Sequence, residues 1–277
     1  GQRSFSYTPP TGFKSICTTN LTDPTIADGS TAFDALLYTG DGQSSKAVTG
    51  YGFSPDFLWI KERSSTSGHG LWNTVVGSSK YLSAESSAAE YTTTTELSSI
   101  DSAGFTVGSS GMTNQSSQTY VAWAWDAGTS TVSNTDGSIT SSVRANPSAG
   151  FSIVSWTCNG SLDQSIGHGL NATPEFLIFK NRDRATNWTV FHKDATTTTQ
   201  KVFYLNSSGA IADYSGGSST WWNALPTSSV FSVGDTGTAV NHTSGDDMIT
   251  YCFAPVAGYS AFGSYTGNGS ADGPFVY

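Results

Sequence analysis

The sequence predicts an all-β protein that is built from tandem β-sandwich domains. Three observations favour this fold: apolar residues recur with the period of two of β-strands, helical periodicity is nearly absent, and one ordered set of motifs occurs twice. The composition agrees, because only 12% of the residues are charged whereas 44 are Ser and 37 are Thr. Hydroxyl side chains tolerate β geometry and can cover the wet faces of strands whose other faces are buried.

Four segments have the patterns of strands. In Tyr120–Trp125 the residues Val, Trp and Trp alternate with Tyr, Ala and Ala, as expected of a strand with one buried face, and Ile249–Phe253 repeats this arrangement. Phe57–Ile60 and Phe176–Phe179 are unbroken apolar runs, which are typical of central strands covered on both faces. Only Ser83–Glu90 could form a short helix, and it carries no apolar stripe.

One set of motifs returns along the chain. Tyr38–Gly42 is followed by a similar Trp156–Gly160 and again by Tyr265–Gly269. After the first two copies come a glycine turn, a proline, four apolar residues and Lys-x-Arg, in Gly50–Arg63 and Gly167–Arg182. Further segments match in the same order: Gly70–Thr74 with Thr189–Lys193, Lys80–Leu82 with Phe203–Leu205, Ala103–Gly108 with Ser229–Gly234, and Tyr120–Trp125 with Met248–Phe253. The period of about 115 residues has the size of a small domain.

The repeats predict the domain organisation. Residues 263–277 begin a third copy, and residues 1–14 alternate aromatic and polar side chains before Pro9-Pro10 ends the pattern. We expect a fragment of a longer repetitive protein; the alternative is an intact protein with untidy termini. The expected parts are an exit strand of a preceding domain with a linker (1–30), a first repeat (31–149), a second repeat (150–262) and the start of a third (263–277).

Charge and composition exclude several classes of partner. The net charge is −9 with only 12 Lys and Arg, whereas nucleic acid and anionic membranes require clustered cations. No apolar run approaches the roughly 20 residues of a membrane span, so we expect no membrane insertion. Cys17, Cys158 and Cys252 include no C-x-x-C pair, which argues against a zinc site. Cys158 and Cys252 lie in expected strands, either as buried free thiols or as a disulfide.

Several motifs resemble a known family. Tyr7–Lys14, which leads into Asp23–Ile26, resembles the exit of a SPRY-like module in structural proteins of marine bacteriophages. The tandem repeats that follow this module are similar to four segments of the chain, namely Asn181–Trp188, Pro226–Phe231, Tyr251–Pro255 and Phe262–Tyr277.

The resemblance implies a component of the virion, in a tail fibre or another appendage, with repeats of concanavalin-like or jelly-roll type. It implies other virion proteins as partners and, from the family alone, a homotrimer. It supplies no catalytic or ligand-binding residue. The expected protein is therefore non-enzymatic and structural, with host-surface glycan as a further partner. The alternatives are a polysaccharide-degrading appendage domain and a cellular lectin-like adhesin.

Tryptophans are the candidate ligand-binding residues, because an exposed aromatic ring can stack on a sugar. Trp59, Trp123, Trp125 and Trp156 lie in strand patterns and are expected in the core. The four tryptophans beside polar, loop-like segments are the candidates for glycan stacking, with burial as the alternative: Trp72, Trp188, Trp221 and Trp222.

No catalytic, metal or cofactor site is expected. The four histidines are not copied between the repeats, and the carboxylates are scattered or, in Asp246-Asp247, adjacent on a strand and so directed to opposite faces. Oxygen-rich turns such as Asp41-Gly42 lack the D-x-[DN]-x-[DN]-G spacing of a calcium loop. The sequence has no G-x-S-x-G elbow either.

Overall fold

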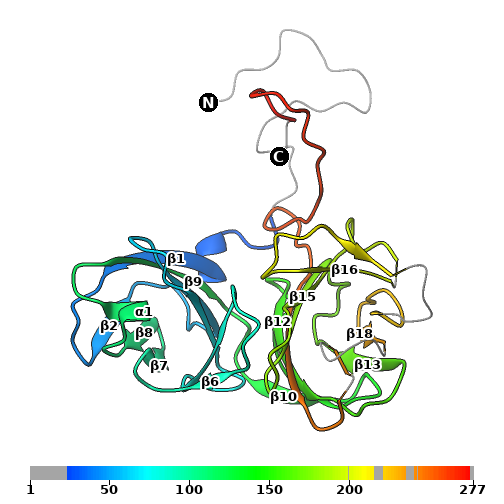
Figure 1. Cartoon of the computed structure of the whole chain (residues 1–277), viewed down its shortest axis with the longest axis horizontal. Coiled ribbons are helices and arrows are strands. Elements are labelled where there is room, and N and C mark those ends of the chain that lie inside the picture. Colours follow the sequence, from blue (N-terminus) through cyan, green and yellow to red (C-terminus); the bar gives the residue numbers. More distant parts are fainter. Residues whose placement is uncertain (1–23, 199, 215–220, 235–239, 242, 275–277) are drawn as a thin grey trace.

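A computed structural model describes residues 24–198, 200–214, 221–234, 240–241 and 243–274. These residues form two β-sandwiches that lie side by side, with the described C-terminal residues running away from both (Figure 1). The prediction of an all-β sandwich fold is confirmed. The expected exit strand and the first part of the expected linker, together with Cys17, lie outside the described residues. None of the described helices is long and apolar enough to cross a membrane.

The first sandwich packs a sheet of six strands against a sheet of three. The larger sheet has the order β1-β9-β3-β4-β5-β6 and the smaller sheet the order β2-β8-β7. Their bounds are β1 (Phe33–Thr39), β2 (Lys46–Thr49), β3 (Phe57–Glu62), β4 (His69–Asn73), β5 (Lys80–Ser83), β6 (Tyr91–Thr92), β7 (Leu97–Asp101), β8 (Gly104–Val107) and β9 (Thr119–Trp125). Two short helical turns, η2 (Gly29–Thr31) and α1 (Gly111–Asn114), flank β1 and β9.

The second sandwich packs a sheet of eight strands, β10-β11-β12-β19-β14-β15-β16-β17, against the pair β13-β18. Their bounds are β10 (Thr131–Asn134), β11 (Ser141–Asn146), β12 (Phe151–Thr157), β13 (Gln164–Gly167), β14 (Phe176–Asn181), β15 (Thr189–His192), β16 (Lys201–Tyr204), β17 (Ala212–Asp213), β18 (Val230–Val233) and β19 (Asp247–Phe253). The hairpin β10–β11 belongs to this sheet, although the boundary expected at residue 149 would place it with the first repeat.

The two large sheets have the same strand order from β1 to β6 and from β12 to β17. Their registers also correspond, since Phe57 lies opposite Trp125 and Asn73, and Phe176 lies opposite Phe253 and His192. One match read from the sequence is shifted: Leu71 pairs with Leu82 and Val190 pairs with Phe203, so Lys80 corresponds to Lys201 rather than to Phe203. The β15–β16 connection is two residues longer than the β4–β5 connection, which hides this register in the sequence.

The alternating strand β9 turns its small side chains inward. Tyr120, Ala122 and Ala124 are completely buried in the core of the first sandwich. Trp123 and Trp125 point to the opposite face of the sheet and are only half-buried, as is Trp59 beside them on β3. Trp156 lies in the core of the second sandwich as expected, whereas Trp59 and Trp125 pack against the apolar cluster between the sandwiches and Trp123 lines a hollow that reaches solvent.

The outer faces of the two large sheets pack on each other and create a third apolar cluster between the sandwiches. Phe57 of β3 stacks on Tyr251 of β19 with ring centroids 4.2 Å apart, and Trp125 contacts Phe151 and Phe253 at 6.1 and 6.4 Å. Asn73 donates a hydrogen bond to the hydroxyl of Tyr251 across this interface. The interface therefore has the apolar interior and polar bonding of a domain core.

A loop of the first sandwich fastens this interface at its edge. This clasp loop, residues 84–90, connects β5 to β6. The indole N–H of Trp188 donates to the carbonyls of Ser83 and Ser86 at 2.8 and 3.1 Å, and the ammonium of Lys180 donates to the carbonyl of Ser87 at 3.3 Å. The guanidinium of Arg182 binds both carboxylate oxygens of Glu90, at 2.7 and 2.9 Å. Because its carbonyls bond to the other sandwich, the loop forms no helix, which corrects the suggestion for Ser83–Glu90.

Glu90→Gln tests whether this ion pair holds the sandwiches together. Glu90 and Arg182 each expose only 8% of their side chains, so the variant removes the buried carboxylate that binds Arg182 twice and leaves only the more exposed Asp247 as a charged partner. We expect the free energy of unfolding, measured in urea, to fall by about 3 kcal/mol. Asp194→Asn, on an exposed loop of the second sandwich, is the matched control and should stay within about 0.5 kcal/mol of the parent. Equal stability of both variants would contradict the structure.

The two described cysteines are buried free thiols, so the disulfide alternative does not hold. Burial raises the pKa of the Cys158 thiol to about 12 and also raises that of Cys252. Because the thiolate is the reactive form, neither should react with iodoacetamide at pH 8 in the folded protein. We expect mass spectrometry of a Cys17→Ser variant to show no adduct in buffer and two adducts in guanidinium. Rapid modification in buffer would contradict this burial.

Candidate functional site

The structure buries all four tryptophans that the sequence proposed for ligand stacking. The exposed fractions are 0% for Trp72 and Trp188, 6% for Trp221 and 2% for Trp222. Trp72 covers Gly70, where an added Cβ would lie 2.1 Å from the indole ring. Trp221 and Trp222 fill the core of the second sandwich, and Trp188 binds the clasp loop. All four rings are buried, so none presents a face to a ligand.

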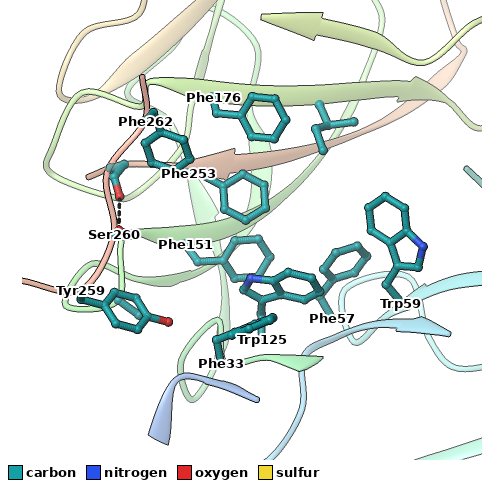
Figure 2. Close-up of a pocket in the computed structure, with 14 residues that line it drawn as sticks. Phe33, Phe57, Trp59, Trp125, Phe151, Phe176, Phe253, Tyr259, Ser260 and Phe262 are labelled. Carbon is teal, nitrogen blue, oxygen red and sulfur yellow. Dashed lines mark hydrogen bonds between the residues drawn. The ribbon is translucent and has the colours of Figure 1, made fainter. Parts of the chain in front are cut away.

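An aromatic groove lies instead where the two large sheets separate at the edge of their interface. It has a volume of about 380 Å³. Figure 2 shows Phe33, Phe57 and Trp125 of the first sandwich on one side of the groove and residues of the second on the other. The second sandwich and the segment that follows it supply Phe151, Phe176, Phe253, Tyr259 and Phe262. Two strand pairs fix the rings: Phe33 lies opposite Trp125 on β1 and β9, and Phe151 lies opposite Phe253 on β12 and β19.

The groove continues onto an uncovered part of the outer face of the first sandwich. A second hollow of about 330 Å³ is lined by Phe33, Trp59, His69, Trp123 and Trp125. The strand registers place Ala35 beside Trp123 and Leu37 beside Val121 on the same face. We call the set Ala35, Leu37, Trp59, His69, Val121 and Trp123 the open face. Leu37 is 65% exposed, so this face is apolar and reaches solvent.

Two titratable side chains lie on this face of the sheet: Lys61, which stands opposite Val121 and His69, and His69 itself. Its ring nitrogen Nδ1 accepts a hydrogen bond of 2.8 Å from the indole of Trp59, so the proton of the neutral ring sits on Nε2. Its backbone N–H donates to the carboxylate of Glu85 at 2.9 Å. Burial lowers the pKa of His69 below its usual range, and the charge of Glu85 opposes this shift. The ring therefore serves to hold Trp59 in place.

The carboxylates that could support hydrolysis are engaged elsewhere. Asp246 pairs with Arg184 at 2.5 Å, Asp247 with Arg182 at 3.4 Å, and Glu175 with Lys193 at 2.9 Å. Asp41 accepts hydrogen bonds from Gln43 and Asn114, as a turn residue does. No three His, Cys, Asp or Glu side chains among the described residues lie close enough to hold a metal ion. The remaining histidines give no alternative, since His168 and His192 each accept a hydrogen bond from the backbone two residues onward and His242 lies outside the described residues.

The groove can therefore bind flat apolar surfaces, and the described residues that line it include no pair of groups for acid–base catalysis. These features define an all-β protein of two joined sandwiches with an exposed aromatic groove. A family model described as a domain of unknown function (DUF7483) matches residues 28–277, and the chain belongs to this family. The matched region includes both sandwiches. No curated protein and no solved structure matches the chain.

Titration of His69 tests the hydrogen bond that orders the open face. Unfolded His binds a proton below about pH 6.5, whereas the folded chain resists protonation until a lower pH. In that window the unfolded state binds more protons, so the free energy of unfolding should decrease as the pH falls. In NMR spectra we expect the Trp59 indole N–H to shift with the midpoint of His69, below pH 6.5. A midpoint above 6.5, or no response of Trp59, would contradict the arrangement.

Proposed function

We propose that the chain is a non-enzymatic structural module of a bacteriophage virion, in which the two sandwiches form a stiff spacer within a tail fibre or another appendage. The motifs that resemble phage structural proteins support the location. The clasped interface supports the mechanical role and is the observation that carries it. Trp188, Lys180 and Arg182 of the second sandwich all bond to the clasp loop of the first, which fixes the orientation of one sandwich on the other.

Surface chemistry is consistent with such a module. The charged fraction of 12% and the abundant Ser and Thr give a largely neutral surface of hydroxyl groups. An extended particle needs its copies to stay soluble without attracting nucleic acid, and a modest negative charge serves that purpose. Other virion proteins are the partners that this role requires.

Binding of host glycan is the second candidate function, because the half-exposed rings of Trp59 and Trp123 offer faces for stacking. This surface differs from the four tryptophans proposed from the sequence, which are buried. Hydrolysis of such a glycan is not favoured, since it requires two carboxyl groups on either side of the cleaved bond. The described lining of the groove holds no carboxylate.

The proposal is tested in two measurements. Mass spectrometry of purified phage particles from the source of the gene should detect the chain as a particle component, with a constant ratio to other structural proteins across preparations. Incubation with the host's surface polysaccharide should leave the polysaccharide chain length unchanged in size-exclusion chromatography, with a known depolymerase as positive control. Absence from the particles, or reproducible shortening of the polysaccharide, would overturn the proposal.

A further inference from the structure

The second sandwich carries a loop, residues 205–211, that corresponds to the clasp loop of the first. The first sandwich carries the open face, which corresponds to the surface of the second sandwich that is covered at the interface. We propose that residues 205–211 of one copy of the chain dock on the open face of a second copy, so that copies associate head to tail. This inference goes beyond the proposed function and depends on the geometry of the chain alone.

The second loop has the length and local structure of the first. The registers of β5–β6 and β16–β17 place residues 205–211 at the positions of residues 84–90. Both loops contain a pair of serines followed by a small residue and Ala, in Ser86–Ala89 and Ser207–Ala210. In each loop the hydroxyl of the first serine, Ser86 or Ser207, accepts a hydrogen bond of 3.1 Å from the backbone N–H two residues later. The backbone N–H of the same serine donates a bond of 3.3 Å to the carbonyl three residues earlier.

Each loop is also anchored to its own sandwich in the same way. The carboxylate of Glu85 accepts a bond from the backbone of His69, and the amide oxygen of Asn206 accepts one from the backbone of Trp188. The first loop holds the second sandwich largely through backbone carbonyls, which do not depend on side-chain identity. Residues 207–211 present the corresponding backbone to solvent.

The receiving groups are duplicated as well. By register Lys61, Arg63 and His69 stand at the positions of Lys180, Arg182 and Trp188. The ammonium of Lys180 donates three hydrogen bonds: to the carbonyls one and four residues onward and to the carbonyl of Ser87 in the clasp loop. Lys61 makes the bonds to the carbonyls one and four residues onward. No third acceptor for Lys61 lies among the described residues.

The receiving groups of the first sandwich remain accessible. The Nε2–H of His69 is a donor at the position where the indole N–H of Trp188 bonds to the clasp loop. Arg63 is exposed, whereas Arg182 is buried against Glu90.

The apolar surfaces show the same relation. Ile153, Ile178 and Tyr251 are buried because the first sandwich covers them. Their counterparts Ala35, Trp59 and Trp123 belong to the open face, which is continuous with the interface inside the chain. The neighbouring part of that sheet, around Phe57 and Leu71, is already covered by the second sandwich of the same chain. An incoming loop therefore covers the half of the sheet that carries β1 and β9.

A second copy fits this surface better than a glycan does. The hollow on the open face is lined by four aromatic rings and one imidazole, and the polar groups beside it, Lys61 and Arg63, stand where their counterparts Lys180 and Arg182 bind a loop of protein. A loop–face contact uses different surfaces on the two copies, so it is heterologous and can extend to chains of more than two.

A charge pair gives the sharpest test. Ile211 stands at the position of Glu90 and is 44% exposed, and Arg63 stands at the position of Arg182. We expect sedimentation velocity to show weak self-association of the parent chain. Ile211→Glu should rebuild the ion pair between copies and tighten association about tenfold, whereas Ile211→Arg should abolish it. Two double variants complete the test. Arg63→Glu combined with Ile211→Glu should lose the gain, because two carboxylates then face each other, whereas Arg63→Glu combined with Ile211→Arg should associate again through the reversed ion pair.

Mixing two non-associating variants tests the head-to-tail geometry. Leu37→Asp damages only the face and Ile211→Arg only the loop, and both sites are exposed, so circular dichroism should show native folding. Each variant alone should be monomeric, and their mixture should form 1:1 dimers that do not grow. If neither the parent nor Ile211→Glu associates up to about 1 mM protein, or if Leu37→Asp prevents association while Ile211→Arg does not, the proposal is wrong. Quenching of Trp123 fluorescence by host polysaccharide, without self-association, would assign the open face to a glycan instead.

Discussion

The structure depends on one constraint: both faces of each large sheet are apolar, so each sheet must be covered twice. The small sheet of each sandwich covers the inner face, where Tyr120, Ala122 and Ala124 are buried. The outer face carries Trp123, Trp125 and Phe57, and apolar area of this kind is costly to leave in water. The chain meets the constraint by packing the outer faces of its two sandwiches together, with Phe57 on Tyr251 at the centre. Neither sandwich is therefore an independent unit of the kind that a flexible string of domains would contain.

Much of the fold could be predicted from the sequence, but the side of each strand that faces inward could not. A period of two is symmetric, so the alternation in Tyr120–Trp125 is satisfied equally by burying its tryptophans or its alanines. The tryptophans in fact point to the outer face of the sheet, where Trp125 packs against the second sandwich and Trp123 belongs to the open face. The candidate site failed for a related reason. The polar neighbours of Trp188 make it a candidate for exposure, but its indole N–H requires a partner, and the partner is a loop about a hundred residues away. Contacts between sandwiches leave no local signal in the sequence.

The aromatic groove and the open face follow from the same constraint, since they are where the second covering is incomplete. The sandwiches separate at the groove, and the β1 side of the first sheet extends past the second sandwich. An apolar surface that remains in solvent after folding commonly marks a contact with another molecule. The chain thus combines a fixed internal joint with a free surface of the same chemistry, which suits its proposed role as a building block of an extended assembly. The low charge of the remaining surface keeps such a block from binding unrelated polyanions.

Native-state hydrogen exchange tests the central claim, that the interface makes the two sandwiches one cooperative unit, most directly. The strands β8 and β18 lie in the small sheets, on opposite sides of the pair and away from the interface. If the sandwiches unfold together, the slowest amides of both strands will open with the same free energy and the same dependence on denaturant. Distinct opening free energies for β8 and β18, separated by more than about 1 kcal/mol in the absence of denaturant, would show two independent domains and contradict the account.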